Sequence, residues 1–231
     1  MDSLPLLLGH RGVRGLRYHV RENTVAAFEL ALEHGCDGFE FDVRLTADGC
    51  GVVCHNPRSG GINIAKTAVA RLKRLPQLKD VLARYADRAF LDIELKVPGL
   101  ETCLLSALSE HPPRRGYVVS SFLPQVLLDL KAQDEAIPLG IICETRYELA
   151  RCPDLPAEYV FVKESLIKPE LVQKVHDKGR RLLAWTVNNK RSMVRLAEMG
   201  VDGIISDKAD LLVQTLGQFG KIESMNRTET A

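Results

Sequence analysis

Three carboxylates stand near the ends of apolar runs that resemble strands. Glu40 and Asp42 lie two residues apart in one run, and Glu94 lies in another. Side chains two apart in a strand point to the same face, so Glu40 and Asp42 share a side. Buried carboxylates are costly unless they are paired or bind a metal. Because oxygen ligands suit Mg²⁺ or Ca²⁺, we expect the three to hold one divalent cation.

Ion pairs along the same strands are the alternative explanation for these carboxylates. Glu94 would then pair with Lys96, and Asp42 with Arg44. The number of polar residues that coincide at strand ends favours the cation site.

Two histidines and two basic residues flank the carboxylates. His10 and His55 have ordinary pKa values near neutrality, so they can serve as a general acid and a general base. Arg11 and Lys96 can bind a phosphate, the first through its fork of donors and the second as a point charge. Glu22 is expected to orient His10 or Arg11.

Eight short apolar runs alternate with helical patterns and must position these residues. Such alternation predicts a parallel sheet covered by helices, and eight units fit a closed (β/α)8 TIM barrel, whose site lies at the carboxyl ends of the strands. Trp185 and Asn188 fall at the same end. An open doubly wound sheet is the alternative, but it usually carries a glycine-rich loop where His10-Arg11-Gly12 stands here. The expected strands are 6–9, 38–43, 90–95, 117–120, 138–142, 159–162, 182–187 and 203–206. The expected helices include 24–34, 77–86, 100–110, 124–133, 169–178 and 190–199.

A hairpin is expected directly after the second strand. Asp48-Gly49 suits a two-residue type I′ turn. With those residues as the loop, Ala47 would face Cys50 and Asp42 would face His55. Opposed residues point to the same face, so the hairpin would return His55 to the Asp42 carboxylate.

Helix-end residues and composition predict the helix cap, the extent of the domain and the state of the cysteines. Asn23 is expected to cap the first helix. We expect one barrel domain over 1–217 and a polar, fraying tail over 218–231. The six cysteines show no CxxC or zinc spacing and are expected to be free thiols.

The bulk properties limit the partners. A formal net charge of +1 predicts no nucleic-acid partner. The beginning of the chain has no basic segment, and its apolar run is too short for a signal or a span. We therefore expect a cytoplasmic protein without a stable membrane anchor, and the sequence holds no signal for an oligomeric state.

The ordered set of motifs resembles the glycerophosphodiester phosphodiesterases. It covers about residues 4 to 217. The motifs are Leu8-Gly9-His10-Arg11-Gly12, Glu22-Asn23-Thr24, Gly38-Phe39-Glu40-Phe41-Asp42 through Asp48-Gly49, Val52-Val53-Cys54-His55, Leu91-Asp92-Ile93-Glu94-Leu95-Lys96, Ser121-Phe122, Trp185-Thr186-Val187-Asn188 and Gly203-Ile204-Ile205-Ser206-Asp207.

The resemblance implies a TIM barrel that hydrolyses a small glycerophosphodiester to glycerol 3-phosphate and an alcohol. It implies that a divalent cation, Mg²⁺ or Ca²⁺, is bound by the three carboxylates, and that His10 and His55 form the acid–base pair. It also implies that Arg11 and Lys96 hold the phosphate and that Trp185 packs on the glycerol. Asn188 and Glu22 would orient these groups without contacting the substrate.

The chain departs from the family pattern after His55. The family usually has His-Asp where this chain has His55-Asn56, and the segment 57–76 is shorter than usual and lacks an Arg-Thr-Thr signature. A more open mouth would admit lysophospholipids. A phospholipase D that cleaves lysophospholipids and an inactive barrel that only binds phosphodiesters are therefore the competing functions.

Overall fold

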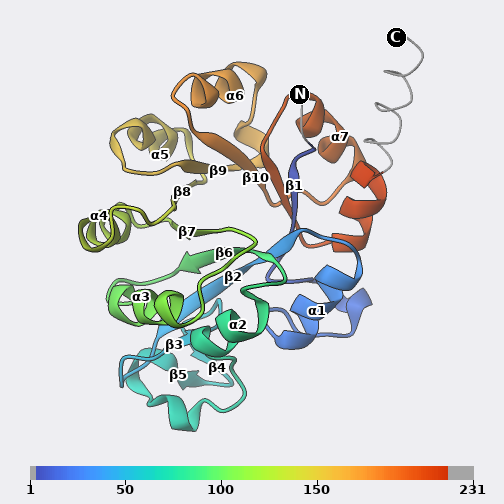
Figure 1. The fold of residues 1–231 in the computed structure, drawn as a ribbon. Helices are drawn as coiled ribbons and strands as arrows, with labels where there is room; N and C mark the ends of the chain where they lie inside the picture. The colour runs from blue at the N-terminus through green and yellow to red at the C-terminus, as the bar shows by residue number, and fades with distance from the viewer. Residues whose placement is uncertain (1–3, 218–231) are drawn as a thin grey trace.

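The computed structural model describes residues 4–217, which form a closed barrel of parallel strands surrounded by helices (Figure 1). The predicted TIM barrel is confirmed, and the open doubly wound alternative is wrong because the first strand pairs with both the second and the last. The barrel strands are β1 (Leu6–His10), β2 (Gly38–Leu45), β6 (Phe90–Leu95), β7 (Tyr117–Ser121), β8 (Leu139–Cys143), β9 (Tyr159–Lys163), β10 (Arg181–Trp185) and β11 (Gly203–Ser206).

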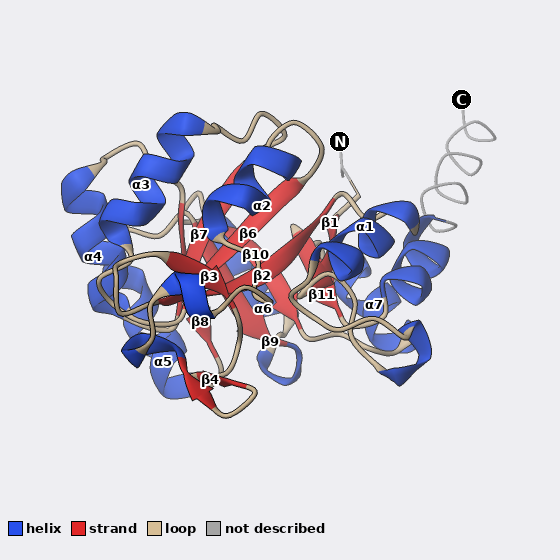
Figure 2. Cartoon of the chain, turned by 90° about the horizontal axis from the view of Figure 1, so that it is seen from below, coloured by secondary structure: helices blue, strands red, loops and turns tan. Residues whose placement is uncertain are grey.

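Helices cover the outside of the barrel, as the side view shows (Figure 2). A further helical stretch over 209–217 follows β11. One helix, α5, has two turns at most and is not among the expected helices. The helices are α1 (Val25–Glu33), α2 (Leu78–Tyr85), α3 (Glu101–Glu110), α4 (Pro124–Gln133), α5 (Arg146–Arg151), α6 (Pro169–His176) and α7 (Lys190–Glu198).

Alternation along β2 explains how one strand serves both the core and the site. Phe39 and Phe41 point outward and pack against Phe28 of α1, with the Phe28 and Phe39 rings stacked at 4.2 Å. Their neighbours Glu40 and Asp42 therefore point into the barrel. The lower interior is filled by apolar side chains such as Leu8 and Phe90, which leaves the polar residues at the carboxyl end.

The predicted cap of the first helix is wrong by one residue. Thr24 is the N-cap, and its side chain accepts a hydrogen bond from the Ala27 amide. Asn23 lies just outside the helix at a φ of 57° and donates to Asp42 at 2.7 Å instead. Both residue types suit a cap, but Asn also tolerates the left-handed conformation required here.

The hairpin after β2 exists, but its predicted register is wrong by one residue. Its second strand, β3 (Gly51–Val53), pairs Val43 with Val53 and Leu45 with Gly51. The loop therefore contains three residues and ends at Gly49, whose φ of 79° is left-handed. Cys54, rather than His55, lies opposite Asp42 and donates its amide to the Asp42 carbonyl.

A small two-stranded hairpin follows in the shortened segment 57–76. It consists of β4 (Arg58–Ser59) and β5 (Ile62–Asn63) and precedes short 3₁₀ turns at Ile64–Lys66 and Val69–Arg71. The predicted fraying of 218–231 concerns residues outside the described part of the chain. Within residues 4–217, no helix has the length and apolar character needed to cross a bilayer.

Candidate active site

Sheet register brings the three predicted carboxylates together at the barrel mouth. On β2 and β6, Asp42 is paired in register with Glu94, and Glu40 lies two residues before Asp42 on the same face. One ligand oxygen from each of the three residues lies within 4.8 Å of the others, and all three side chains are buried. The spacing of two along each strand is the physical origin of this cluster.

Hydrogen bonds hold these carboxylates but leave two oxygens without a hydrogen-bond partner. Glu40 Oε2 accepts the Arg11 amide at 2.9 Å, and Asp42 Oδ2 accepts Asn23 Nδ2 at 2.7 Å. Glu40 Oε1 and Asp42 Oδ1 are buried and accept no hydrogen bond. Buried carboxylate oxygens of this kind are costly unless a cation approaches them. The donor set is therefore suited to a hard divalent cation.

The directions in which the pKa values of the three carboxyl groups are shifted support the same conclusion. Burial, followed by repulsion from Asp42, raises the pKa of Glu40 well above its ordinary value and raises the pKa of Glu94 to about 7. Burial also acts to raise the pKa of Asp42, but Arg11 and Lys96 more than offset this and lower it. A cation bound by all three would relieve the repulsion.

Ion pairs are also present, but they differ from the alternative that the sequence suggested. Lys96 Nζ lies 2.6 Å from Glu94 Oε1 and 3.3 Å from Asp42 Oδ1. Arg44 does not pair with Asp42 and donates to the His55 carbonyl oxygen at 2.7 Å. One lysine shared between two carboxylates leaves the Glu40 charge without a lysine partner, so ion pairing explains only part of the cluster.

Arg11 lies at the edge of the cluster with its side chain buried. Its Nη1 donates to Glu22 Oε1 at 2.8 Å, and its Nε lies 3.2 Å from Asp42 Oδ2. Glu22 therefore contacts Arg11, as expected, and it also pairs with Arg14 at 2.7 Å. The guanidinium is held between two carboxylates and faces the cavity at the mouth.

His10 reaches the mouth from β1, where it is paired in register with Glu40. Its Nδ1 lies 2.7 Å from Asp207 Oδ1, and its Nε2 lies 3.8 Å from Glu40 Oε2. Asn188 donates to Asp207 Oδ2 at 2.7 Å and accepts the Asp207 amide. Asn188 thus contacts Asp207, which in turn contacts His10, and Asp207 is a site residue that was not expected from the sequence.

His55 reaches the same cavity although the hairpin register differs from the expected one. The β3 strand ends at Val53, and the chain bends at His55, which turns the side chain back toward the mouth. Burial lowers the pKa of His55, and the nearby Asp42 charge opposes that effect. Its Nδ1 lies 3.1 Å from Asn56 Oδ1, so Asn56 contacts the His55 ring directly.

Two aromatic rings form one wall of the cavity. Trp185 at the end of β10 meets Phe122 edge to face at 5.5 Å, and Lys96 Nζ lies 5.5 Å from the centre of the Phe122 ring. The cavity has a volume of about 290 Å³, enough for a small ligand. Phe122 was not an expected site residue, although its position directly after the end of β7 is a signal for one.

The fold and the site together define a barrel enzyme with a buried acidic cluster at its mouth. The family model described as "Glycerophosphoryl diester phosphodiesterase family" matches residues 10–102 and 63–211. A glycerophosphodiester phosphodiesterase of Caldanaerobacter subterraneus is 31% identical over 245 residues, covering 93% of this chain and 99% of that protein. A probable glycerophosphodiester phosphodiesterase of Mycobacterium tuberculosis is also 31% identical, over 91% and 90%. The chain therefore belongs to the glycerophosphoryl diester phosphodiesterase family, and the expected enzyme class is confirmed.

Solved structures agree with this assignment. A putative glycerophosphoryl diester phosphodiesterase of Silicibacter pomeroyi shares the fold with a TM-score of 0.84 over 95% of each chain at 24% identity. A phosphodiesterase of Oleispira antarctica, solved in complex with the product sn-glycerol-3-phosphate, has a TM-score of 0.82 and 26% identity over 93% of this chain and 97% of that one.

Proposed function

We propose that this phosphodiesterase hydrolyses small glycerophosphodiesters, such as glycerophosphocholine and glycerophosphoethanolamine, to sn-glycerol 3-phosphate and an alcohol. The observation that carries the proposal is the convergence of two histidines on three buried carboxylates, with Arg11 and Lys96 beside them. The product bound to the Oleispira antarctica relative supports the choice of substrate. A cytoplasmic location stays a prediction from the sequence.

Glu40, Asp42 and Glu94 are the proposed ligands of one Mg²⁺ or Ca²⁺ ion. A cation bound there would polarise the phosphoryl group and lower the pKa of a hydroxyl beside it. Arg11 and Lys96 are proposed to bind the phosphate oxygens and to stabilise the charge that develops on them. Trp185, with Phe122 beside it, is proposed to pack against the glycerol carbons.

The two histidines are proposed to move the protons. With Nδ1 of His10 bound to Asp207, Nε2 is left facing the cavity, and His55 faces the same space. One imidazole accepts the proton of the attacking hydroxyl, either the glycerol 2-hydroxyl or water, and the other protonates the leaving alkoxide. An assay of glycerol 3-phosphate release from glycerophosphocholine, with and without EDTA, tests this proposal. No release with metal present would contradict it and favour a binding barrel.

A phospholipase D activity on lysophospholipids is the second candidate. The observation that favours it is that large apolar side chains stand exposed in two connections between barrel strands. Leu16, in the connection after β1, is 96% exposed, and Ile62, on the short strand β5 in the connection between β2 and β6, is 42% exposed. Release of choline from acyl-bearing substrates alone would favour this candidate.

Asp207 is proposed as a positioning residue that acts through His10. We expect Asp207→Asn to lower kcat by roughly 10–100-fold, by analogy with the loss found when a carboxylate that orients a metal-bound histidine is removed. The same substitution in a His10→Ala background should cost nothing further, because its only role in the reaction would already be lost. Steady-state kinetics of the two single variants and the double variant measure this. Additive losses would contradict the assignment.

Asn56 gives a second, smaller test. Asn56→Asp places a carboxylate beside His55 Nδ1, which stabilises the protonated ring and should raise the pKa of His55. The histidine ring signals in NMR spectra recorded across pH measure the change. Ser59→Asp, three residues further along at the end of β4, adds the same single negative charge and is the control for charge alone. An equal shift in both variants would show that the Asn56 contact has no special effect.

A further inference from the structure

Two buried cysteines meet on the outer side of the barrel, away from the proposed active site. Cys143 ends β8, and Cys152 begins a 3₁₀ turn (Cys152–Asp154) directly after α5. Their Sγ atoms lie 2.7 Å apart, and both side chains are buried. All six cysteines lie within the described residues, and this is the only pair of them whose sulfurs are in hydrogen-bond contact. The contact therefore singles out one pair.

The backbone on both sides of this contact is fixed. Cys143 is paired in register with Val162 of the neighbouring strand β9. Arg180 donates to the carbonyl oxygens of Cys152, Pro153 and Leu155 at 2.8, 3.0 and 2.9 Å. A bond between the sulfurs, whose ordinary length is about 2.05 Å, therefore needs only a small approach of the two side chains.

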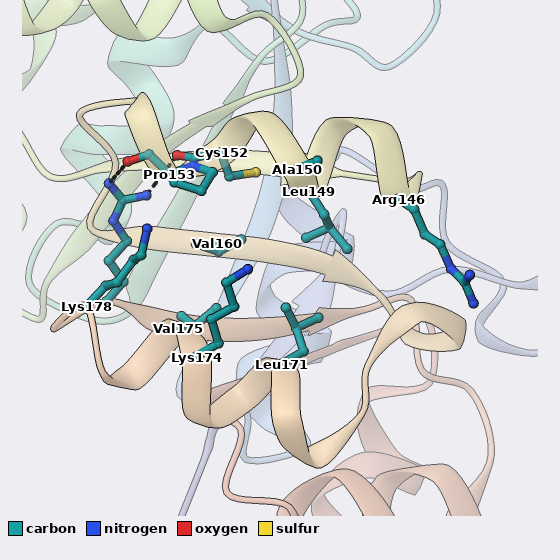
Figure 3. A pocket seen from close by; sticks show the side chains of 11 residues that line it. Arg146, Leu149, Ala150, Cys152, Pro153, Val160, Leu171, Lys174, Val175 and Lys178 are labelled. Carbon is teal, nitrogen blue, oxygen red and sulfur yellow. Dashed lines mark hydrogen bonds between the residues drawn. The ribbon is translucent and has the colours of Figure 1, made fainter.

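A pocket lies beside one of the two cysteines. Cys152 lines a pocket of about 260 Å³ between α5, α6 and β9, and Figure 3 shows its sulfur among apolar side chains such as Leu149. Arg146, Lys174 and Lys178 also line this pocket. Basic side chains favour a thiolate, which is the form of cysteine that reacts with oxidants.

The two sulfurs are unequal partners. The hydrogen bond from Cys143 lowers the pKa of Cys152, burial opposes this, and the Arg180 charge lowers it further. The same contact, followed by burial, raises the pKa of Cys143. Cys152, which lines the pocket together with Arg180, is therefore the cysteine suited to react first, and Cys143 the one suited to resolve the product.

We propose that Cys143 and Cys152 form a redox modification site, in which a small peroxide converts the two thiols into a reversible disulfide. This inference does not depend on the proposed phosphodiesterase mechanism. The disulfide would link the end of β8 to the turn after α5, and it would cross-link the segment between them. Ile142 and Glu144, on either side of Cys143, line the proposed active site, so the linked segment begins at its wall.

The reaction balances with hydrogen peroxide as the oxidant. The Cys152 thiolate attacks the peroxide, an S–O bond forms as the O–O bond breaks, and the released hydroxide becomes water with the Cys152 proton. Cys143 sulfur then attacks the sulfenic sulfur, and the S–S bond forms as the S–O bond breaks. The leaving hydroxide takes the Cys143 proton as a second water. Two electrons pass from the sulfur pair to the peroxide, and an added dithiol reverses the change by exchange.

Peptide mapping of the native protein tests the proposal directly. The folded chain is treated with an equimolar amount of hydrogen peroxide, its free thiols are then blocked under denaturing conditions, and it is digested with trypsin. Cleavage after Arg146 and Arg151 separates the two cysteines into peptides 132–146 and 152–163. We expect these two peptides to appear as one linked species that dithiothreitol separates. Linkage of other cysteines, over-oxidation of Cys152 without linkage, or survival of all six thiols would overturn the proposal.

A matched control removes a cysteine outside the pair. Cys103→Ser should keep the link, because the Cys103 thiol contacts the Leu100 carbonyl rather than a sulfur. Cys143→Ser should lose it, and loss in both variants would contradict the assignment. The linked wild-type protein should also have a Tm higher by roughly 5 °C than the reduced form, because the bond constrains the unfolded chain. A lower Tm would show that the native fold does not accommodate the bond.

Discussion

Replacing His10 or His55 with alanine is expected to lower kcat by about 10²–10⁴, the range found when a side chain that transfers a proton is removed. Both imidazoles face the cavity that the three carboxylates adjoin, and they arrive there from separate elements. KM should change much less, because Arg11 and Lys96, the proposed phosphate-binding residues, remain in place. Initial rates of glycerol 3-phosphate release over a range of substrate concentrations separate the two effects.

A substrate with an activated leaving group distinguishes the roles of the two histidines. The p-nitrophenyl ester of glycerol phosphate releases a phenolate that needs no proton. The variant that lacks the general acid should therefore recover most of its rate on this substrate, whereas the variant that lacks the base should not. Recovery by both variants, or by neither, would argue against a division of labour between acid and base.

His176→Ala is a suitable control for these experiments. His176 ends α6, bonds to Asp202 at 2.8 Å, and lies with it on a different cavity, at the opposite end of the barrel strands. We expect full activity from this variant. A loss comparable to that of His10→Ala would show that the assay reports on folding rather than on proton transfer.

Removal of divalent cations is expected to reduce activity by about 10³ or more, because metal stabilisation of phosphoryl charge contributes several kcal/mol. Mg²⁺ or Ca²⁺ should restore it. Glu40→Gln should abolish this restoration while leaving the fold intact, since it removes one charged ligand and keeps the side-chain shape. Calorimetric titration with each metal measures binding separately from turnover. Metal binding by Glu40→Gln at wild-type affinity would remove Glu40 from the ligand set.

Glu40→Gln should also make the metal-free protein more stable, with a defined dependence on pH. Burial and repulsion from Asp42 raise the pKa of Glu40 in the folded state. The folded chain therefore binds more protons than the unfolded chain, and its stability falls as pH rises above the unfolded pKa. Glutamine has no such dependence, so the Tm difference in EDTA should widen with rising pH. Saturating metal should reverse the difference, because it stabilises only the wild type. A wild-type Tm above the variant's in EDTA would contradict the proposed repulsion.

The barrel and most of the site could be predicted from the sequence because both depend on the periodicity of the strands. Charged residues two apart in an apolar strand must share a face, and this places Glu40, Asp42 and Glu94 together at the carboxyl end once the sheet is parallel. The contacts that orient the site residues, such as the one between Asp207 and His10, could not be predicted. Asp207 follows the last strand immediately before a helical stretch, where an aspartate is equally expected as a helix cap.

The hairpin register could not be predicted because Asp48-Gly49 suits two loop types. The dipeptide fits a two-residue turn, and it also fits a three-residue loop that ends in a left-handed glycine. Thr46 decides between them, since its hydroxyl accepts the Cys50 amide and also contacts Asp48 at 2.6 Å. His55 still reaches the site because the bend after β3 compensates for the shift of one residue.

Asn23 determines which residues outside the proposed active site must be kept with it if the site is transferred to another protein. It sits in a left-handed conformation, and its side chain donates to the Asp42 carboxylate through Nδ2 and accepts the Asp42 backbone amide through Oδ1. Its own backbone amide donates to the Arg11 carbonyl. A protein engineer who transplanted only the carboxylates and histidines to another barrel would leave Asp42 without this support. The smallest portable unit therefore includes the whole connection 11–23, together with the strands on either side of it.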